Sequence, residues 1–93
     1  MINTNTKVHL IKKLDATDLS GEKAMIDFST GKYFLLKGAA NEIWDFMVAN
    51  TDTTVEAIKN ELLQIYEVDE ETCLTSICEF LENLKINEFV RLD

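Results

Sequence analysis

The sequence has few of the residues on which most catalytic and metal centres depend. Its 93 residues include two cysteines, one histidine, three glycines and no proline. Cys73 and Cys78 are five positions apart on what the pattern indicates is a single helix, a spacing that suits neither a disulfide framework nor a zinc site. We therefore expect both cysteines to be reduced packing residues, and we expect neither a metal nor any other cofactor.

Evidence for catalysis is also scarce. His9, the single histidine, falls on an expected strand with no serine or cysteine partner near it in the sequence. Each glycine falls in an expected turn, so the chain has no glycine-rich phosphate loop. The 17 acidic residues are dispersed along helix faces, as on a solvated surface. We predict that the protein is not an enzyme.

Acidic residues outnumber basic ones. The chain has 17 aspartates and glutamates against nine lysines and arginines, which gives a net charge of -8. Phosphate neutralisation supplies much of the affinity of nucleic-acid-binding proteins, so this balance argues against nucleic acid and favours a basic peptide as a partner. No apolar run approaches the roughly 18 residues that span a membrane, and the segment MINTNTKVHLIKK lacks the pattern of a secretory signal. We expect a cytoplasmic protein with no membrane partner.

The first third of the chain is rich in β-strand patterns, within a length that suits one domain over residues 1–93. Alternating and β-branched residues predict three strands, at residues 7–14, 23–28 and 32–36. A polar loop at 15–22 joins the first two strands, and a turn at 29–31 joins the last two. Connections this short predict an antiparallel meander.

Apolar residues at helical spacing follow Gly38 and predict three helices, at residues 39–50, 54–66 and 70–85. Asp52 or Thr53 is the expected N-cap of the second helix, with Glu56 completing a capping box after Thr53, and Asp69 is the expected N-cap of the third. The final EFVRL forms a short strand or an extended segment. The predicted class is α+β, with an N-terminal three-stranded antiparallel sheet followed by three helices, an order that suggests a winged helix-turn-helix.

The third expected strand is apolar on both faces, because Tyr33 and Leu35 point one way and Phe34 and Leu36 the other. A strand inside a covered sheet has the same pattern. The last strand of a meander, however, lies at an edge unless the C-terminal segment pairs with it, and an open edge can bind a peptide strand.

The third helix also has more apolar surface than packing requires. Its apolar residues spread over about 160°, whereas a stripe of roughly 100° is enough to pack on a core. They are Cys73, Leu74, Ile77, Cys78, Phe80, Leu81 and Leu84. Either a small core covers this helix on two sides, or one margin of the helix lines a groove.

A winged helix-turn-helix also suggests a DNA-binding transcriptional regulator, which stays open as the alternative function. Residues 69–85, which would include the recognition helix, hold five acids against Lys85. Phosphates would repel such a helix, so the charge disfavours this alternative.

Three stretches of the chain together resemble the PqqD family of peptide chaperones, also called RiPP recognition elements. They are GEKAMIDFSTGKYFLLKGAANEIWDFM, VEAIKNELLQIYEVD and CLTSICEFLENLKINEFV. The resemblance covers about residues 19–90, and its matching positions are Asp27, Gly31, Tyr33, Leu36, Ile43, Trp44, Phe80, Leu81 and Leu84. Two positions depart from the family pattern: Lys37 replaces a common Asn, and Asn87 replaces a usual Gly whose left-handed conformation Asn tolerates.

The resemblance implies that the chain binds the leader segment of a ribosomally made precursor peptide, as an antiparallel strand added to residues 32–36 and lying against the third helix. Tyr33 or Phe34 would form apolar pockets with residues of that helix, on its Cys73/Phe80 margin, and Glu71 with the two acids before it would weakly attract a basic leader residue. The implied peptide-binding residues are Lys32, Tyr33, Phe34, Leu35, Leu36, Asp69, Glu70, Cys73, Ile77 and Phe80.

An enzyme partner is implied as well. The stretch LSGEKAMIDFSTGKYF is most similar to stand-alone members from lasso-peptide gene clusters, which pass the precursor to a leader peptidase. A radical-SAM enzyme is the rival partner. The open edge strand allows a monomer or a weak homodimer.

Overall fold

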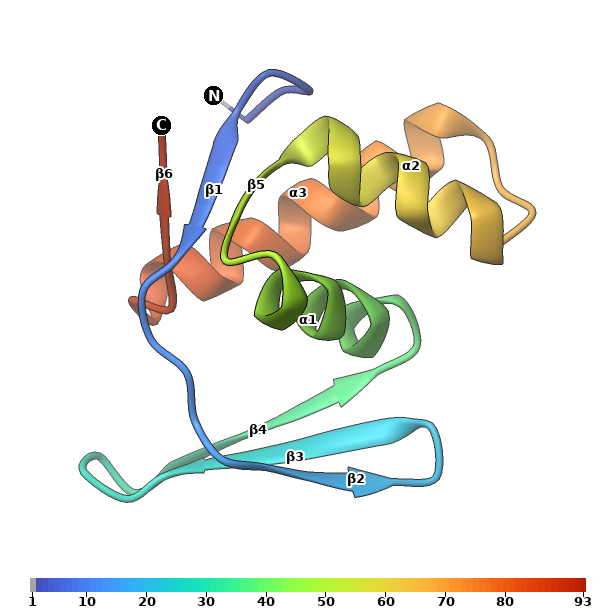
Figure 1. Ribbon diagram of the computed structural model, residues 1–93. Helices are drawn as coiled ribbons and strands as arrows, with labels where there is room; N and C mark the ends of the chain where they lie inside the picture. Colours follow the sequence, from blue (N-terminus) through green and yellow to red (C-terminus); the bar gives the residue numbers. More distant parts are fainter. Residues whose placement is uncertain (1) are drawn as a thin grey trace.

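The computed structural model describes residues 2–93, and it shows two small antiparallel sheets and three helices (Figure 1). The strands are β1 (Lys7–Leu10), β2 (Ala16–Leu19), β3 (Glu22–Asp27), β4 (Lys32–Lys37), β5 (Asp52–Thr54) and β6 (Val90–Leu92). The helices are α1 (Ala39–Ala49), α2 (Val55–Ile65) and α3 (Glu70–Ile86). The strand orders are β2-β3-β4, here called the meander, and β5-β1-β6. The predicted α+β class, with a three-stranded sheet followed by three helices, is confirmed.

The first strand of the meander differs from the prediction. The expected strand at residues 7–14 shortens to β1, which pairs with β5 and β6 and not with β3. The meander begins instead with β2, inside the segment that was predicted to be a polar loop. Every residue of β2 is exposed, so the strand lacks the alternation of buried and exposed residues that reveals a strand in a sequence.

A tight turn specifies the pairing of β2 with β3. Leu19 pairs with Glu22, which leaves Ser20 and Gly21 as a two-residue loop with φ of 44° and 88°. Positive φ at both central residues is typical of the type I′ turn, whose twist matches that of the flanking strands. A Ser-Gly dipeptide is a recognised turn signal, so the hairpin was marked in the sequence although its first strand was not.

The helices begin and end within a residue or two of their predicted positions. Asp69 caps α3 as expected, since its side chain accepts a hydrogen bond from the Thr72 backbone N–H at 3.3 Å. The predicted cap of α2 was wrong. Thr54 takes that role by accepting a hydrogen bond from the Ala57 N–H at 3.1 Å, because residues 52–54 pair with β1 as a strand. None of the helices in the described part of the chain is long and apolar enough to cross a bilayer.

One aromatic side chain connects the meander to the rest of the molecule. Phe89, just before β6, is fully buried, with its ring centroid 5.0 Å from that of Phe34 on β4 and 5.6 Å from that of Trp44 on α1. Both pairs meet edge to face, a geometry that adds stability beyond the burial of apolar area. The Lys12 ammonium lies 5.1 Å from the same ring, a favourable cation–π contact. Phe89 therefore packs between β4 and α1, and it fixes the position of β4 relative to the helices.

We expect Phe89→Ala to lower the free energy of unfolding by about 3–5 kcal/mol, because it leaves a cavity where three elements meet. Urea unfolding followed by Trp44 fluorescence would measure this loss. The matched control is Val68→Ala in the exposed connector between α2 and α3, which should change stability by no more than about 0.5 kcal/mol. A loss as small as that of the control would contradict the role assigned to Phe89.

Candidate functional site

β4 has an open edge. Among residues 2–93 it pairs only with β3, from Glu22↔Lys37 to Asp27↔Lys32. The C-terminal segment, which could have paired with β4, forms β6 in the other sheet. Backbone N–H and C=O groups of alternate β4 residues therefore point away from the meander, and such an edge can accept a further strand.

The C-terminal end of α3 lies near the start of β4. A hollow of about 140 Å³ lies between them, lined by Lys12, Asp27, Thr30, Lys32, Phe34, Ile86, Asn87 and Glu88. Small-molecule sites usually enclose about 300–1,000 Å³, so this hollow suits a single side chain better than a cofactor. Because α3 ends at this hollow and β4 begins there, the two elements run in opposite chain directions along the molecule (Figure 1).

One apolar margin of α3 is covered from within the chain. At that margin the Cys78 sulfur lies 4.0 Å from the backbone oxygen of Ile2, so the N-terminal segment covers it. Phe80 follows Cys78 by two positions, which places it about 200° further around the helix at 100° per residue. Its ring is half-buried. The Phe80 margin therefore lies on the side of α3 away from the covering N-terminal segment.

Two of the residues proposed for the groove lie too deep to contact a peptide. Cys73 is 4% exposed and Ile77 is fully buried, so both belong to the core. Burial also raises the pKa of the Cys73 thiol, which keeps it protonated and unreactive. Less buried apolar residues of α3 include Phe80, which is half-buried, and Ile86, which is 75% exposed and lines the hollow near the start of β4. Ile86 was not among the candidate residues predicted from the sequence. Its position on the polar side of the helix pattern could have indicated an exposed apolar contact.

The two faces of β4 have different surroundings. Phe34 and Leu36 point toward the helices, where Phe34 packs on Phe89 and Leu36 is buried. Tyr33 and Leu35 point to the opposite side and are 75% and 47% exposed. Of the two aromatic residues considered for a pocket with α3, only Phe34 lies on the helix side of the strand.

The acids at the start of α3 already have partners within the chain. Asp69 caps the helix, and the Glu70 carboxylate accepts a hydrogen bond from the Lys59 ammonium at 2.7 Å. Lys59 is buried at 8% exposure, and its hydrogen bond to Glu70 raises the pKa of its ammonium group. A basic peptide residue would therefore compete with Lys59 for Glu70, while both acids stay exposed to solvent.

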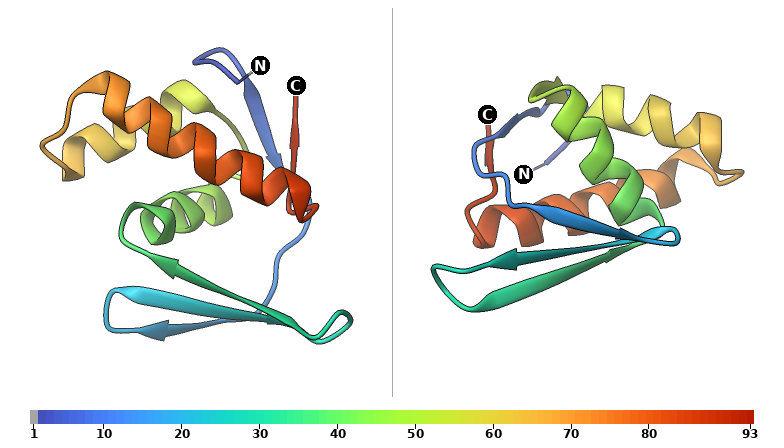
Figure 2. Two further views of the ribbon diagram at one scale, coloured as in Figure 1. Left: turned by 180° about the vertical axis from the view of Figure 1, so that it is seen from behind. Right: turned by 60° about the horizontal axis from the view of Figure 1, so that its bottom comes forward.

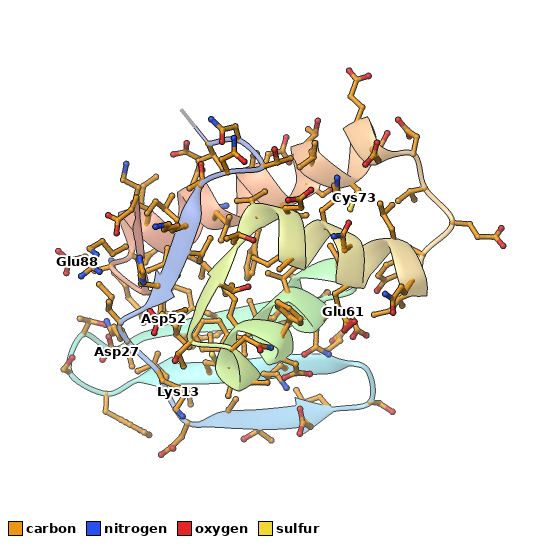
Figure 3. All side chains as sticks on the ribbon, turned by 45° about the horizontal axis from the view of Figure 1, so that its top comes forward. Lys13, Asp27, Asp52, Glu61, Cys73 and Glu88 are labelled. Atoms are coloured by element: carbon orange, nitrogen blue, oxygen red, sulfur yellow. The ribbon has the colours of Figure 1, made fainter. Side chains whose placement is uncertain are left out.

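Asp27 organises the hairpin at the start of β4 (Figure 3). Its buried carboxylate accepts hydrogen bonds from the Lys12 ammonium at 2.8 Å, and from the Ser29 hydroxyl and backbone N–H at 2.6 and 3.0 Å. Its backbone oxygen accepts a hydrogen bond from Gly31, which has φ of 75°. The bond from Lys12, followed by those from Ser29, holds the pKa of this carboxyl far below its usual range. Asp27 thereby positions the first residue of the open edge.

Other parts of the described chain offer less for a functional site. The residues from 2 to 93 contain no group of three His, Cys, Asp or Glu side chains that could hold a metal ion. His9 on β1 lies with Nδ1 2.6 Å from an Asp52 carboxylate oxygen and Nε2 2.9 Å from one of Asp93, so it lies between β5 and the residue after β6. Two larger hollows, of about 410 and 440 Å³, border β6 and are lined by no residue of β4.

The comparison with protein families decides what kind of protein carries this edge. A family model described as "Coenzyme PQQ synthesis protein D (PqqD)" matches residues 22–90, from the start of β3 to the start of β6. The chain belongs to the PqqD family. This result confirms the resemblance found in the sequence, and the matched range includes the open edge of β4 and all of α3.

A solved structure supports the fold of this PqqD-family chain. It is described as "TbiB1 in Complex with the TbiA(beta) Leader Peptide", and it superposes with a TM-score of 0.76. The alignment covers 89% of this chain and 94% of that one at 22% sequence identity, so the similarity concerns the fold. No curated protein sequence matches the chain.

We expect Asp27→Asn to destabilise the protein at neutral pH and to make its stability less sensitive to acid. A carboxyl whose pKa is lower in the folded state stabilises the protein above its ordinary pKa, and this contribution is lost as the pH falls below about 4. Urea unfolding at several pH values from 7 to 2 would measure both effects. The control is Asp15→Asn, since Asp15 is exposed. Parallel pH dependences for Asp27→Asn and wild type would contradict the role given to Asp27.

Proposed function

We propose that this protein is a non-catalytic chaperone that captures the leader segment of a ribosomally synthesised precursor peptide and presents it to a modifying enzyme. The observation that carries the proposal is the open edge of β4, with the end of α3 beside its start, in a chain of the PqqD family. The similar structure, whose description names a leader peptide bound to TbiB1, supports the same use of the fold.

In the proposed complex the leader adds to β4 as an antiparallel strand. Backbone groups of residues 32–36 supply most of the hydrogen bonds, so affinity depends little on leader sequence, while side-chain pockets supply specificity. Alternate leader side chains point toward α3, where Phe34, Phe80 and Ile86 offer apolar contacts. Other leader side chains point outward, on the side of Tyr33 and Leu35.

The direction of the leader follows from the direction of β4. An antiparallel leader runs parallel to α3, because α3 and β4 run in opposite directions (Figure 1). Its N-terminal end then lies near Asp69 and Glu70, and its C-terminal end lies near the hollow between Lys32 and Asn87. A basic residue near the leader's N-terminal end would be attracted, with the modest energy typical of exposed charges.

The remaining parts of the proposal concern partners and setting. A lasso-type leader peptidase is the favoured enzyme partner, and a radical-SAM enzyme is second. We infer one cytoplasmic leader-binding domain over residues 1–93, acting as a monomer or weak homodimer without a cofactor. A DNA-binding regulator is disfavoured because α3 begins with acids and the chain has a net charge of -8.

A synthetic leader of the precursor encoded beside this gene should bind with a Kd between about 1 nM and 10 μM. Isothermal titration would measure the affinity, and amide hydrogen exchange would locate the site. Strand addition should slow exchange at alternate residues of β4, because only every second N–H points to the open edge. Failure to bind folded protein at high micromolar concentration would refute the proposed function, and salt-sensitive binding of duplex DNA would favour the regulator.

Phe80→Ala should weaken leader binding by about tenfold, because it removes an apolar contact on the uncovered margin of α3. The matched control is Cys78→Ala on the margin covered by the N-terminal segment, which should leave the Kd within twofold of wild type. Circular dichroism would check that both variants fold. Equal effects of the two changes would show that the leader does not use the Phe80 margin.

A further inference from the structure

Strand β3 departs from the usual pattern of a sheet packed on a core, because it carries charged residues on the core side and an exposed apolar residue on the other. On β3 the side toward the helices carries Lys23, Met25 and Asp27, all buried, while Ile26 on the other side is 48% exposed. Antiparallel sheets normally place apolar residues on the core and polar residues in water. The exposed apolar residue on the solvent side of β3 therefore needs an explanation.

The charges on the side facing the helices are stabilised only through specific partners. Lys23 is 6% exposed and forms ion pairs with Asp18 on β2 and, at 3.0 Å, with Asp45 on α1. Its hydrogen bonds to Asp18 and then to Asp45 raise the pKa of its ammonium, which keeps the group charged. Asp27 is held by Lys12 in the same way. Buried charges cost free energy unless they are paired, so apolar residues here would have been the simpler solution.

The opposite side of the meander, here called the outer face, is mostly apolar and faces solvent. Strand register places Ile26 opposite Tyr33 and Ala24 opposite Leu35 on this face, and on β2 it places Leu19 opposite Glu22, diagonal to Ala24. All three helices lie on the other side of the meander (Figure 2). The exposed fractions are 47% for Leu19, 48% for Ile26, 75% for Tyr33 and 47% for Leu35. A contiguous exposed apolar surface on a small protein usually marks an interaction site.

We propose that the outer face is the docking surface for the enzyme that processes the bound precursor, through an apolar patch on that enzyme with a basic surround. This inference rests on the proposed function. It also explains why the outer face is apolar, because its apolar residues are then buried in the complex.

The path of the precursor supports an enzyme as the occupant. A leader that runs antiparallel to β4 leaves the groove at the start of that strand, so the residues that follow the leader emerge at the β3–β4 hairpin. Phe28 lies in that hairpin, two positions after Ile26 in the sequence, with 87% of its surface exposed. An enzyme acting on the emerging residues therefore approaches the chaperone at the outer face.

The bound leader also extends the same surface. Side chains alternate along a strand, so half of those on an added leader strand lie level with Tyr33 and Leu35. The enzyme then contacts chaperone and leader side chains together. The two binding events should be coupled, with the enzyme binding the leader-loaded chaperone more tightly than the free chaperone.

Charge favours a separate partner over a second copy of this chain. Two copies would each bring a net charge of -8, and this repulsion opposes self-association. The outer face itself carries the cross-strand pair Glu22 and Lys37, whose charges compensate each other at 3.9 Å. The acidic residues of the rest of the chain would attract a basic partner toward this apolar surface, whose own two charges compensate each other.

The test uses the double variant Leu19→Thr, Ile26→Thr, whose threonines suit strands and lie outside the proposed leader-binding residues. The probes are the purified leader-processing enzyme and the synthetic precursor, both encoded beside this gene. We expect leader affinity within twofold of wild type, but at least a tenfold loss in enzyme affinity for the leader-loaded chaperone and in the kcat/KM of chaperone-dependent processing. The control is Val68→Thr, an exposed apolar residue of the α2–α3 connector, which should change neither.

A second variant distinguishes a loss of enzyme docking from a folding defect. Phe28→Ser alters an almost fully exposed turn residue, so it should fold normally and still weaken enzyme docking. Processing of both variants at the wild-type rate, with normal leader binding, would overturn the docking proposal and leave the proposed function intact. Sedimentation showing a wild-type dimer that the double variant abolishes would overturn it in favour of a second copy. Absence of leader binding to wild type would instead refute the proposed function.

Discussion

The edge-to-face contacts of Phe89 with Phe34 and Trp44 are the interaction on which the rest of the structure depends. They connect the helix-facing side of β4 to α1 and to the segment between α3 and β6. Because this contact uses one face of the strand, it leaves the edge of β4 unpaired and its outer face uncovered. The proposed leader-binding edge and the proposed docking face are the parts of the meander that this packing leaves uncovered.

The same arrangement explains why the meander tolerates charge in its helix-facing layer. Phe89 and its neighbours supply apolar contact near the start of β4, while Lys23 reaches Asp45 on α1 and Lys12 reaches Asp27. These ion pairs are directional, so they orient the meander as well as attach it. Among the apolar residues of β3, Met25 is buried on the helix side, while Ala24 and Ile26 lie on the outer face.

Local signals in the sequence were enough for most of the helices and turns. Asp69 as an N-cap, Gly31 in the hairpin and the apolar spacing of α1 and α3 all correspond to the structure. β2 escaped prediction because an exposed edge strand held by backbone pairing has no apolar periodicity. The cap of α2 was misplaced because residues 52–54 pair with β1, a contact between segments more than 40 positions apart.

By itself the sequence determined the α+β class, the family, the net acidic charge and the double-sided apolar pattern of β4, because these are properties of composition and short-range spacing. Only the tertiary structure decided which strands pair, which face of β3 is buried and which margin of α3 stays open. Each of those depends on contacts between distant segments: β1 with β5 and β6, Lys23 with Asp45, and Cys78 with Ile2. The tertiary structure also placed Cys73 and Ile77 in the core, since helical spacing cannot show how deeply a helix face is buried.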